Sequence, residues 1–126
     1  MNRLRAVLAL PSLLGLGHAA AAQAPTIELR PGLVITRSVR VAPRRYHIAA
    51  PASLDSAAIT IRGNDITVDF AGATLDGAAN GSDPDGAAGV GIRIDGGERV
   101  QIRGGRIRGY KVGILARRTR ALTLAD

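Results

Sequence analysis

The chain of 126 residues carries 17 lysines and arginines against 10 aspartates and glutamates, a formal net charge of +7 at pH 7. It is long enough for one modest domain and too short for two. The absence of cysteine excludes disulfides and thiol chemistry. Only three scattered aromatic residues accompany the positive charge, and single-strand binders need stacked aromatic platforms, so no nucleic-acid partner is predicted: Tyr46, Phe70 and Tyr110.

Residues 1–22 are predicted to be a secretory signal peptide. Two arginines precede a mostly apolar run (residues 6–16), and small residues suited to a signal peptidase follow at 19–24. Cleavage is expected after Ala22, because cleavage two residues later would place Pro25 just behind the scissile bond. The apolar run is too short to span a bilayer, and no later stretch forms a membrane span. The expected location is therefore secreted or periplasmic, whereas a buried N-terminal helix is disfavoured by the glycines and proline of this segment.

Residues 23–56 are predicted to form a β-rich N-terminal cap. Apolar residues alternate with polar ones at Val39 and Val41 and again at Tyr46 and Ile48, as expected of short strands with one buried face. Prolines within the segment mark breaks between these strands.

A sequence repeat dominates residues 57–126. Val90-Gly91-Ile92 recurs as Val112-Gly113-Ile114 after 22 residues, and an earlier copy is offset by 32 to 34 residues because residues 78–89 are inserted. Apolar residues alternate within each copy, which predicts strands, and glycine-containing turns separate the strands. Three short strands per turn and a period near 22 indicate a β-solenoid, since an antiparallel sandwich has no reason to repeat at this interval.

The stretch AAITIRGNDITVDFAGATLDG (57–77), followed by GVGIRIDGGERVQIRGGRIRGYKVGILARRTRALTLAD (89–126), resembles the opening coils of right-handed parallel β-helix proteins of the pectin-lyase-like type. The resemblance implies an all-β fold, a right-handed parallel β-helix with an N-terminal cap and about three incomplete coils over residues 57–126. The last predicted strand, at 122–124, is followed by no polar cap. The chain is therefore read as the N-terminal part of a longer protein, whose missing C-terminal coils would cover this end.

Stacking the copies in register predicts ion pairs between neighbouring turns of the chain. Aligned side chains lie about 4.8 Å apart, so four acid–base pairs are expected: Asp65–Arg99, Asp69–Arg103, Asp76–Arg108 and Arg62–Asp95. Residues 99–120 hold eight basic residues and no acidic one, a run typical of a surface for polyanions such as uronate polysaccharide, nucleic acid or lipopolysaccharide. The predicted pairs favour a solvated ladder for much of this charge, and three basic residues are expected to have no partner: Arg117, Arg118 and Arg120.

No residue is assigned a catalytic role from the sequence. Asp69 and Asp76 each have a predicted arginine neighbour, which makes them poor general acids. His47 is the only histidine after the signal peptide and is expected to be packed or exposed rather than catalytic. The inserted loop offers too few oxygen ligands for calcium, which takes about six to eight, so no metal or cofactor is predicted.

The resemblance implies a parent protein that acts on or binds extracellular carbohydrate, such as a polysaccharide lyase or a glycoside hydrolase. In such enzymes the site generally lies on central coils, so this chain by itself is expected to be inactive. The partner class that fits the charge is acidic polysaccharide. A non-enzymatic surface or adhesive solenoid is the alternative, because a β-helix pattern is diagnostic of fold rather than of activity.

Overall fold

The computed structural model describes residues 24–78 and 86–126. The predicted signal peptide (1–22) lies outside these residues, as do Asn80, Asp83 and Asp85 of the predicted insertion. Within the described ranges, no helix is long and apolar enough to cross a membrane.

The described residues fold into short strands joined by turns. Their bounds are β1 (Thr26–Ile27), β2 (Leu33–Ile35), β3 (Val39–Val41), β4 (Arg45–His47), β5 (Ala57–Ile61), β6 (Thr67–Asp69), β7 (Thr74–Asp76), β8 (Val90–Asp95), β9 (Gln101–Arg103), β10 (Arg106–Arg108), β11 (Val112–Arg117) and β12 (Thr123–Ala125). The predicted all-β class is confirmed for these ranges, in which every sheet pairing is parallel.

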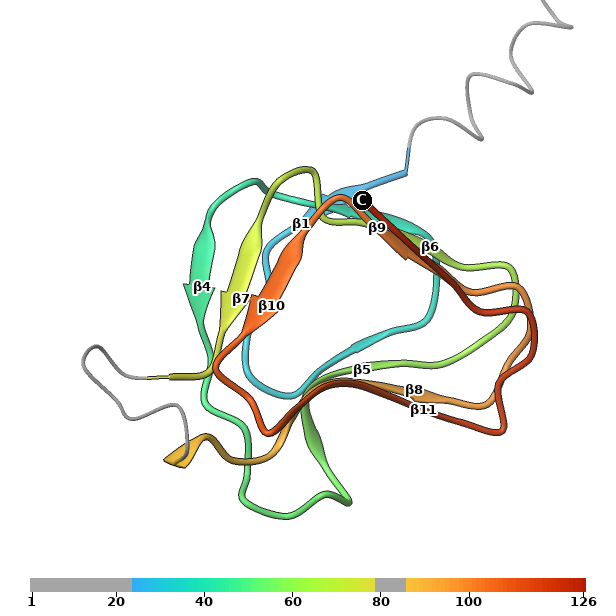
Figure 1. Cartoon of the computed structure of the whole chain (residues 1–126). Coiled ribbons are helices and arrows are strands. Elements are labelled where there is room, and N and C mark those ends of the chain that lie inside the picture. Colours follow the sequence, from blue (N-terminus) through green and yellow to red (C-terminus); the bar gives the residue numbers. More distant parts are fainter. Residues whose placement is uncertain (1–23, 79–85) are drawn as a thin grey trace, which may run out of the picture.

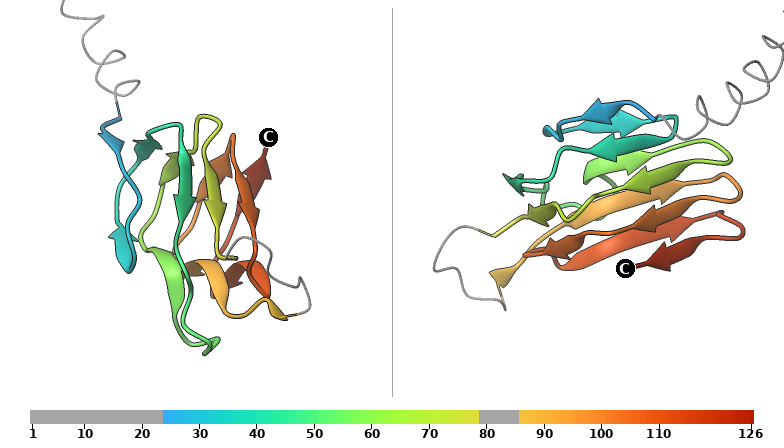
Figure 2. Two further views of the ribbon diagram at one scale, coloured as in Figure 1. Left: turned by 90° about the vertical axis from the view of Figure 1, so that its left-hand side faces the viewer. Right: turned by 90° about the horizontal axis from the view of Figure 1, so that it is seen from above.

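Three parallel sheets form the sides of a stack of coils (Figure 1). Sheet A has the strand order β1-β3-β6-β9-β12, sheet B the order β11-β8-β5-β2, and sheet C the order β10-β7-β4. Each full turn of the chain contributes one strand to sheet B, one to sheet A and one to sheet C before it returns to sheet B. Successive turns therefore lie one beneath the next, as Figure 2 shows from the side, which is the arrangement expected of a β-solenoid.

The predicted register between turns is confirmed. Ile92 of β8 pairs with Ile59 on one side and with Ile114 on the other. In sheet A, Val68 pairs with Ile102, and Asp69 pairs with Arg103. The interval of 22 residues thus corresponds to one turn, and the larger offsets correspond to one turn with a longer connection.

The core runs through the middle of the coils as columns of apolar side chains, nearly all of them aliphatic. Alternate residues of each strand point inward, so that equivalent positions of neighbouring turns contact one another. The side chains that are almost fully enclosed are Phe70, Ile59, Ile61, Ile66, Leu75, Ile92, Ile94, Val41, Val68, Val90 and Val100. With about 1.5–3 kcal/mol for each buried large aliphatic side chain, these columns are the main source of stability in a chain without disulfides.

Strands β1 to β4 lie in the segment that the sequence predicted as a cap (23–56), and they extend the same three sheets. Strand β2 pairs with β5, β3 with β6, and β4 with β7. Strand β1 adds a further strand to sheet A through the pairing of Thr26 with Arg40. The stack of coils thus begins before residue 57.

The corner between sheets B and A has the same backbone in three successive turns. Asp65, Arg99 and Ala121 stack at this corner with φ of 56°, 57° and 54°. Hydrogen bonds join the turns here, because the N–H of Asp65 donates to the carbonyl of Glu98 (2.9 Å) and that of Arg99 to the carbonyl of Arg120 (3.0 Å). A left-handed residue at each turn therefore keeps the corner compact and the strands in register.

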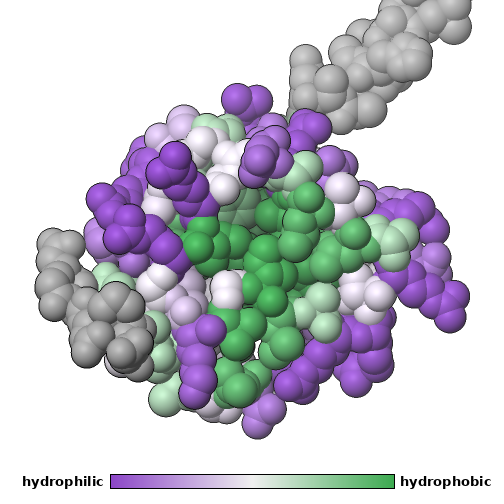
Figure 3. Space-filling model, in the orientation of Figure 1, coloured by the Kyte–Doolittle hydropathy of each residue, from purple (hydrophilic) through white to green (hydrophobic). Residues whose placement is uncertain are grey.

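The end of the stack formed by β10, β11 and β12 is open within the described residues (Figure 3). These strands are the outermost of their sheets, and the apolar interior appears there as a continuous area with a hydrophilic rim. A hollow of about 410 Å³ lies at this end, and its apolar lining comes mainly from Phe70, Ile102, Ile107, Ile114 and Leu124.

Candidate anion-binding site

The four predicted ion pairs between turns are all present. Asp65 pairs with Arg99, and the other nitrogen–oxygen distances are 3.6 Å for Asp69–Arg103, 3.4 Å for Asp76–Arg108 and 3.7 Å for Arg62–Asp95. Most of these side chains are exposed, so each such pair contributes only about 0–1 kcal/mol. These ion pairs therefore fix the positions of surface side chains but contribute little to the stability of the fold.

The prediction that Arg118 has no partner is wrong. A guanidinium nitrogen of Arg118 donates to Oδ1 of Asp95 at 2.8 Å. Arg117 is the residue in register with Asp95, but the backbone leaves the strand at Arg118 with φ of 53°, and the side chain of Arg118 reaches back to the preceding turn. Among the described residues, Arg117 and Arg120 have no carboxylate within 4 Å, as predicted.

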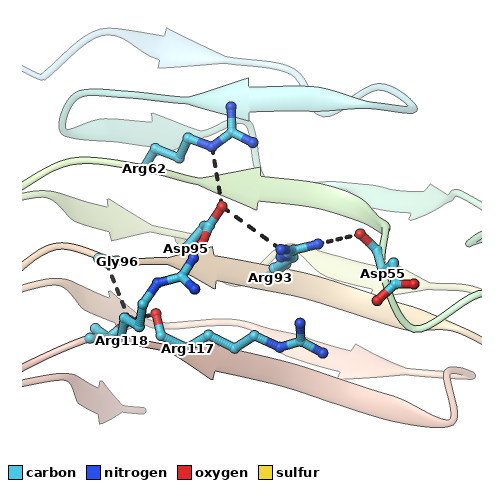
Figure 4. Close-up of polar contacts among 8 residues, drawn as sticks. Asp55, Arg62, Arg93, Asp95, Gly96, Arg117 and Arg118 are labelled. Atoms are coloured by element: carbon cyan, nitrogen blue, oxygen red, sulfur yellow. Dashed lines mark hydrogen bonds and ion pairs between the residues drawn. The ribbon is translucent and has the colours of Figure 1, made fainter.

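Arg62, Arg93 and Arg118 pair with Asp95, and the side chain of Arg117, from the same strand end as Arg118, extends along its strand away from that carboxylate (Figure 4). These four arginines form the candidate site, called the arginine cluster. They come from three successive turns: Arg62 follows β5, Arg93 lies in β8 two residues before Asp95, and the other two lie at the end of β11. Thr119, next to Arg118, links this corner to the preceding turn: its hydroxyl donates a hydrogen bond to the carbonyl oxygen of Gly96 at 3.2 Å.

The contacts to Asp95 are unequal. Arg118 makes the hydrogen bond at 2.8 Å, whereas Arg62 and Arg93 approach the carboxylate at 3.7 and 3.8 Å, distances of ion pairs without a short hydrogen bond. Guanidinium groups stay protonated at any physiological pH. The single carboxylate of Asp95 is therefore shared by three permanent positive charges, and Arg117 adds a fourth that has no ion pair among the described residues, so the cluster keeps a positive excess.

Arg93 is the least exposed member, with 19% of its side chain accessible. One of its terminal nitrogens donates to the backbone carbonyl of Asp55, in the connection between β4 and β5. Its buried Nε has no hydrogen-bond partner within the described part of the chain. Because Arg93 is partly enclosed, its positive charge is less screened than that of an exposed arginine and attracts an anionic group more strongly.

The exposed members are Arg62 and Arg118, with 58% and 77% of their side chains accessible, and Arg117, which is exposed as well. They surround the partly enclosed Arg93 and leave N–H groups directed to solvent. Guanidinium forks match carboxylate, sulfate and phosphate oxygens in geometry and charge. The cluster can therefore bind an anionic group.

The carboxylates considered from the sequence lie on different faces. Asp69 belongs to sheet A, Asp76 to sheet C and Asp95 to sheet B, so these three do not form the close pair on one face that glycoside hydrolysis requires. The described residues contain no group of three or more histidines, cysteines or acids that could hold a metal ion.

Asp76 is buried, which the sequence did not indicate. Only 4% of its side chain is accessible, and a hydrogen bond from the N–H of Ala78 (2.9 Å) lowers its pKa, helped by Arg108, Arg45 and His47 against the effect of burial. It is therefore a permanent carboxylate at neutral pH and unsuited to general acid catalysis. His47 is exposed on the outer face of β4, in register with Asp76.

Sequence reasoning missed the convergence on Asp95. It paired Asp95 with Arg62 alone, although Arg93 and Asp95 are two residues apart in one strand and hence on the same face. The spacing of two residues could have predicted the contact of Arg93 with Asp95. The contact of Arg118 with Asp95 could not be predicted in this way, because it depends on the backbone geometry of the corner.

Comparisons with models of protein families, with curated proteins and with solved structures found no match for the chain.

Proposed function

We propose that this protein is an exported right-handed β-helix of the pectin-lyase-like type that binds acidic polysaccharide through the arginine cluster. The observation that carries the proposal is that three guanidinium groups, those of Arg62, Arg93 and Arg118, share the single carboxylate of Asp95, while Arg117 beside them has no ion pair among the described residues. Uronate chains carry a carboxylate on every ring, and each carboxylate can accept two parallel hydrogen bonds from one guanidinium.

The geometry of the cluster suits a polymer better than a single small anion. Its arginines are spread over three turns of the stack, spaced about 4.8 Å apart in the direction of hydrogen bonding. A chain with repeated carboxylates can contact several turns at once, and each further contact becomes intramolecular, which raises the overall affinity. Export is proposed with this function because extracellular polysaccharide is met outside the cell, and residues 1–22 have the pattern of a signal peptide.

Binding of polygalacturonate to the chain, measured by isothermal titration calorimetry at low salt, tests the proposal. Replacing Arg62 and Arg117 together by alanine is expected to weaken binding at least about tenfold, because each charged hydrogen bond contributes about 1.5–3 kcal/mol. The fold should survive, since Arg117 lacks an ion pair among the described residues and Arg62 makes only a long one.

The matched control replaces Arg30 and Arg40, two exposed arginines outside the ion pairs of Asp95, with the same change in net charge; Arg40 lies in sheet A, whereas Asp95 lies in sheet B. If both double variants lose affinity equally, binding follows net charge alone and the cluster is not the site. Absence of binding by the wild-type chain, or equal binding of neutral dextran, contradicts the function itself.

A further inference from the structure

The outer face of sheet C carries a second basic array, separate from the arginine cluster. Two columns of outward-facing side chains run across β4, β7 and β10. One column is Arg45–Thr74–Arg106 and the other is His47–Asp76–Arg108, both fixed by the parallel register. The residues between them, Tyr46, Leu75 and Ile107, face the core.

Asp76 lies at the centre of this array and holds two of its arginines. Its Oδ2 atom is 3.4 Å from a terminal nitrogen of Arg45 and 3.4 Å from Nε of Arg108. Its Oδ1 atom accepts the N–H of Ala78, so that both carboxylate oxygens are engaged. Asp76 is nearly inaccessible beneath the two arginines, whereas 55% of the Arg45 side chain and 62% of the Arg108 side chain are accessible to solvent.

The third arginine of the array, Arg106, does not pair with Asp76. It is exposed and makes no ion pair with any described residue, although it lies on the same strand face as Arg108. The half-buried Thr74 is in register with both Arg45 and Arg106, and its hydroxyl makes no hydrogen bond within residues 24–78 and 86–126. Three arginines thus face one carboxylate, around a hydroxyl that can still donate.

We infer that this array is a second binding site, which takes one oxyanion group, such as a sulfate or carboxylate, above Thr74 between Arg45 and Arg106. The guanidinium groups of these two arginines supply charged donors from opposite sides, and the hydroxyl of Thr74 donates from beneath. Asp76 is a positioning residue, since its ion pairs with Arg45 and Arg108 hold the guanidinium groups over the sheet. The site takes the anion either free or carried on a polymer.

The test follows the Nε–Hε resonances of the arginines by NMR while the full chain is titrated with inorganic sulfate. Saturable shifts are expected for Arg45 and Arg106. Arg106→Ala should weaken this binding about tenfold or more, and Thr74→Val by a smaller factor, because Arg106 supplies a positive charge and several donors whereas the Thr74 hydroxyl supplies one uncharged donor. Arg30→Ala is the matched control, and it should leave the sulfate affinity unchanged.

A second titration with galacturonate distinguishes the ligand forms. Shifts with galacturonate alone assign the site to planar carboxylates, and shifts with sulfate alone assign it to tetrahedral anions. The double variant at Arg62 and Arg117 should bind at Arg106 as the wild type does, so failure of the proposed polysaccharide function remains separable from failure of this site. Shifts that are absent, linear at all arginines or unaltered by Arg106→Ala would overturn the inference.

Discussion

Replacing Val68 tests which face of β6 points into the coil. Val68 is fully enclosed and pairs in register with Val39 and Ile102, so its surroundings offer no polar partner. Val68→Asp forfeits about 1.5–3 kcal/mol of apolar burial. It also encloses an unpaired carboxylate, which costs several kcal/mol more. A loss of at least about 4 kcal/mol is expected, a large part of the 5–15 kcal/mol that holds most domains folded.

The milder change Val68→Thr keeps the shape and exchanges one methyl group for a hydroxyl. It should cost about 1–3 kcal/mol, the desolvation penalty of an unsatisfied polar group, and it stays measurable if the aspartate variant does not fold. Both are followed by urea unfolding, monitored by far-UV circular dichroism, as the shift of the midpoint at constant slope.

The control is one residue away. Thr67 lies on the outer face of β6, half-exposed and in register with Gln101. Thr67→Asp should change the free energy of unfolding by no more than about 1 kcal/mol, as is usual for surface substitutions. Equal losses at the two positions, or a larger loss at Thr67, would refute the orientation of β6 and with it the register of sheet A, because a slip of one residue exchanges the two faces.

Three further predictions concern backbone strain, acid stability and processing. Ala71 has φ of 52°, so Ala71→Gly should raise the free energy of unfolding by about 0.5–1 kcal/mol, measured by thermal unfolding. Folding lowers the pKa of Asp76 from its ordinary value of 3.8. The ionised carboxylate therefore stabilises the fold above pH 3.8, and this stabilisation is lost as the pH falls through the pKa of the folded state. Asp76→Asn should remove this part of the acid dependence, measured by urea unfolding between neutral pH and pH 2. Expression with export in a bacterial host should yield a chain whose N-terminal sequence begins at Gln23, and a periplasmic chain that begins at Met1 would contradict cleavage after Ala22.

The coils of residues 57–126 could be predicted because their repeat is visible in the sequence. The interval from Ile92 to Ile114 equals one turn, and a single repeated alignment then fixed the ion pair of Asp69 with Arg103. The strands before residue 57 gave no such signal: Leu33 pairs with Ile59 and Val39 with Val68, at intervals of 26 and 29 residues, and no motif recurs between them.

The candidate sites were less accessible to sequence reasoning. Cα register identifies the facing residue but not the length of a side chain, so Arg118 and its reach to Asp95 were missed. The burial of Asp76 was missed for a related reason. Its outward position in β7 suggested exposure, whereas Arg45 and Arg108 from the two neighbouring strands lie over it.

The corner from sheet C to sheet B differs from the other corners in how widely the length of its connection varies from turn to turn. The chain crosses it through residues 48–56 after β4, residues 77–89 after β7, and only residues 109–111 after β10, yet the flanking strands keep their pairing each time. The length of this connection is therefore decoupled from the stacking of the coils. Additional chain can be accepted at this corner at little entropic cost, since the closure penalty grows only slowly with loop length. It is the natural place to graft a peptide epitope, and the place where related chains can diverge in length while the coils stay the same.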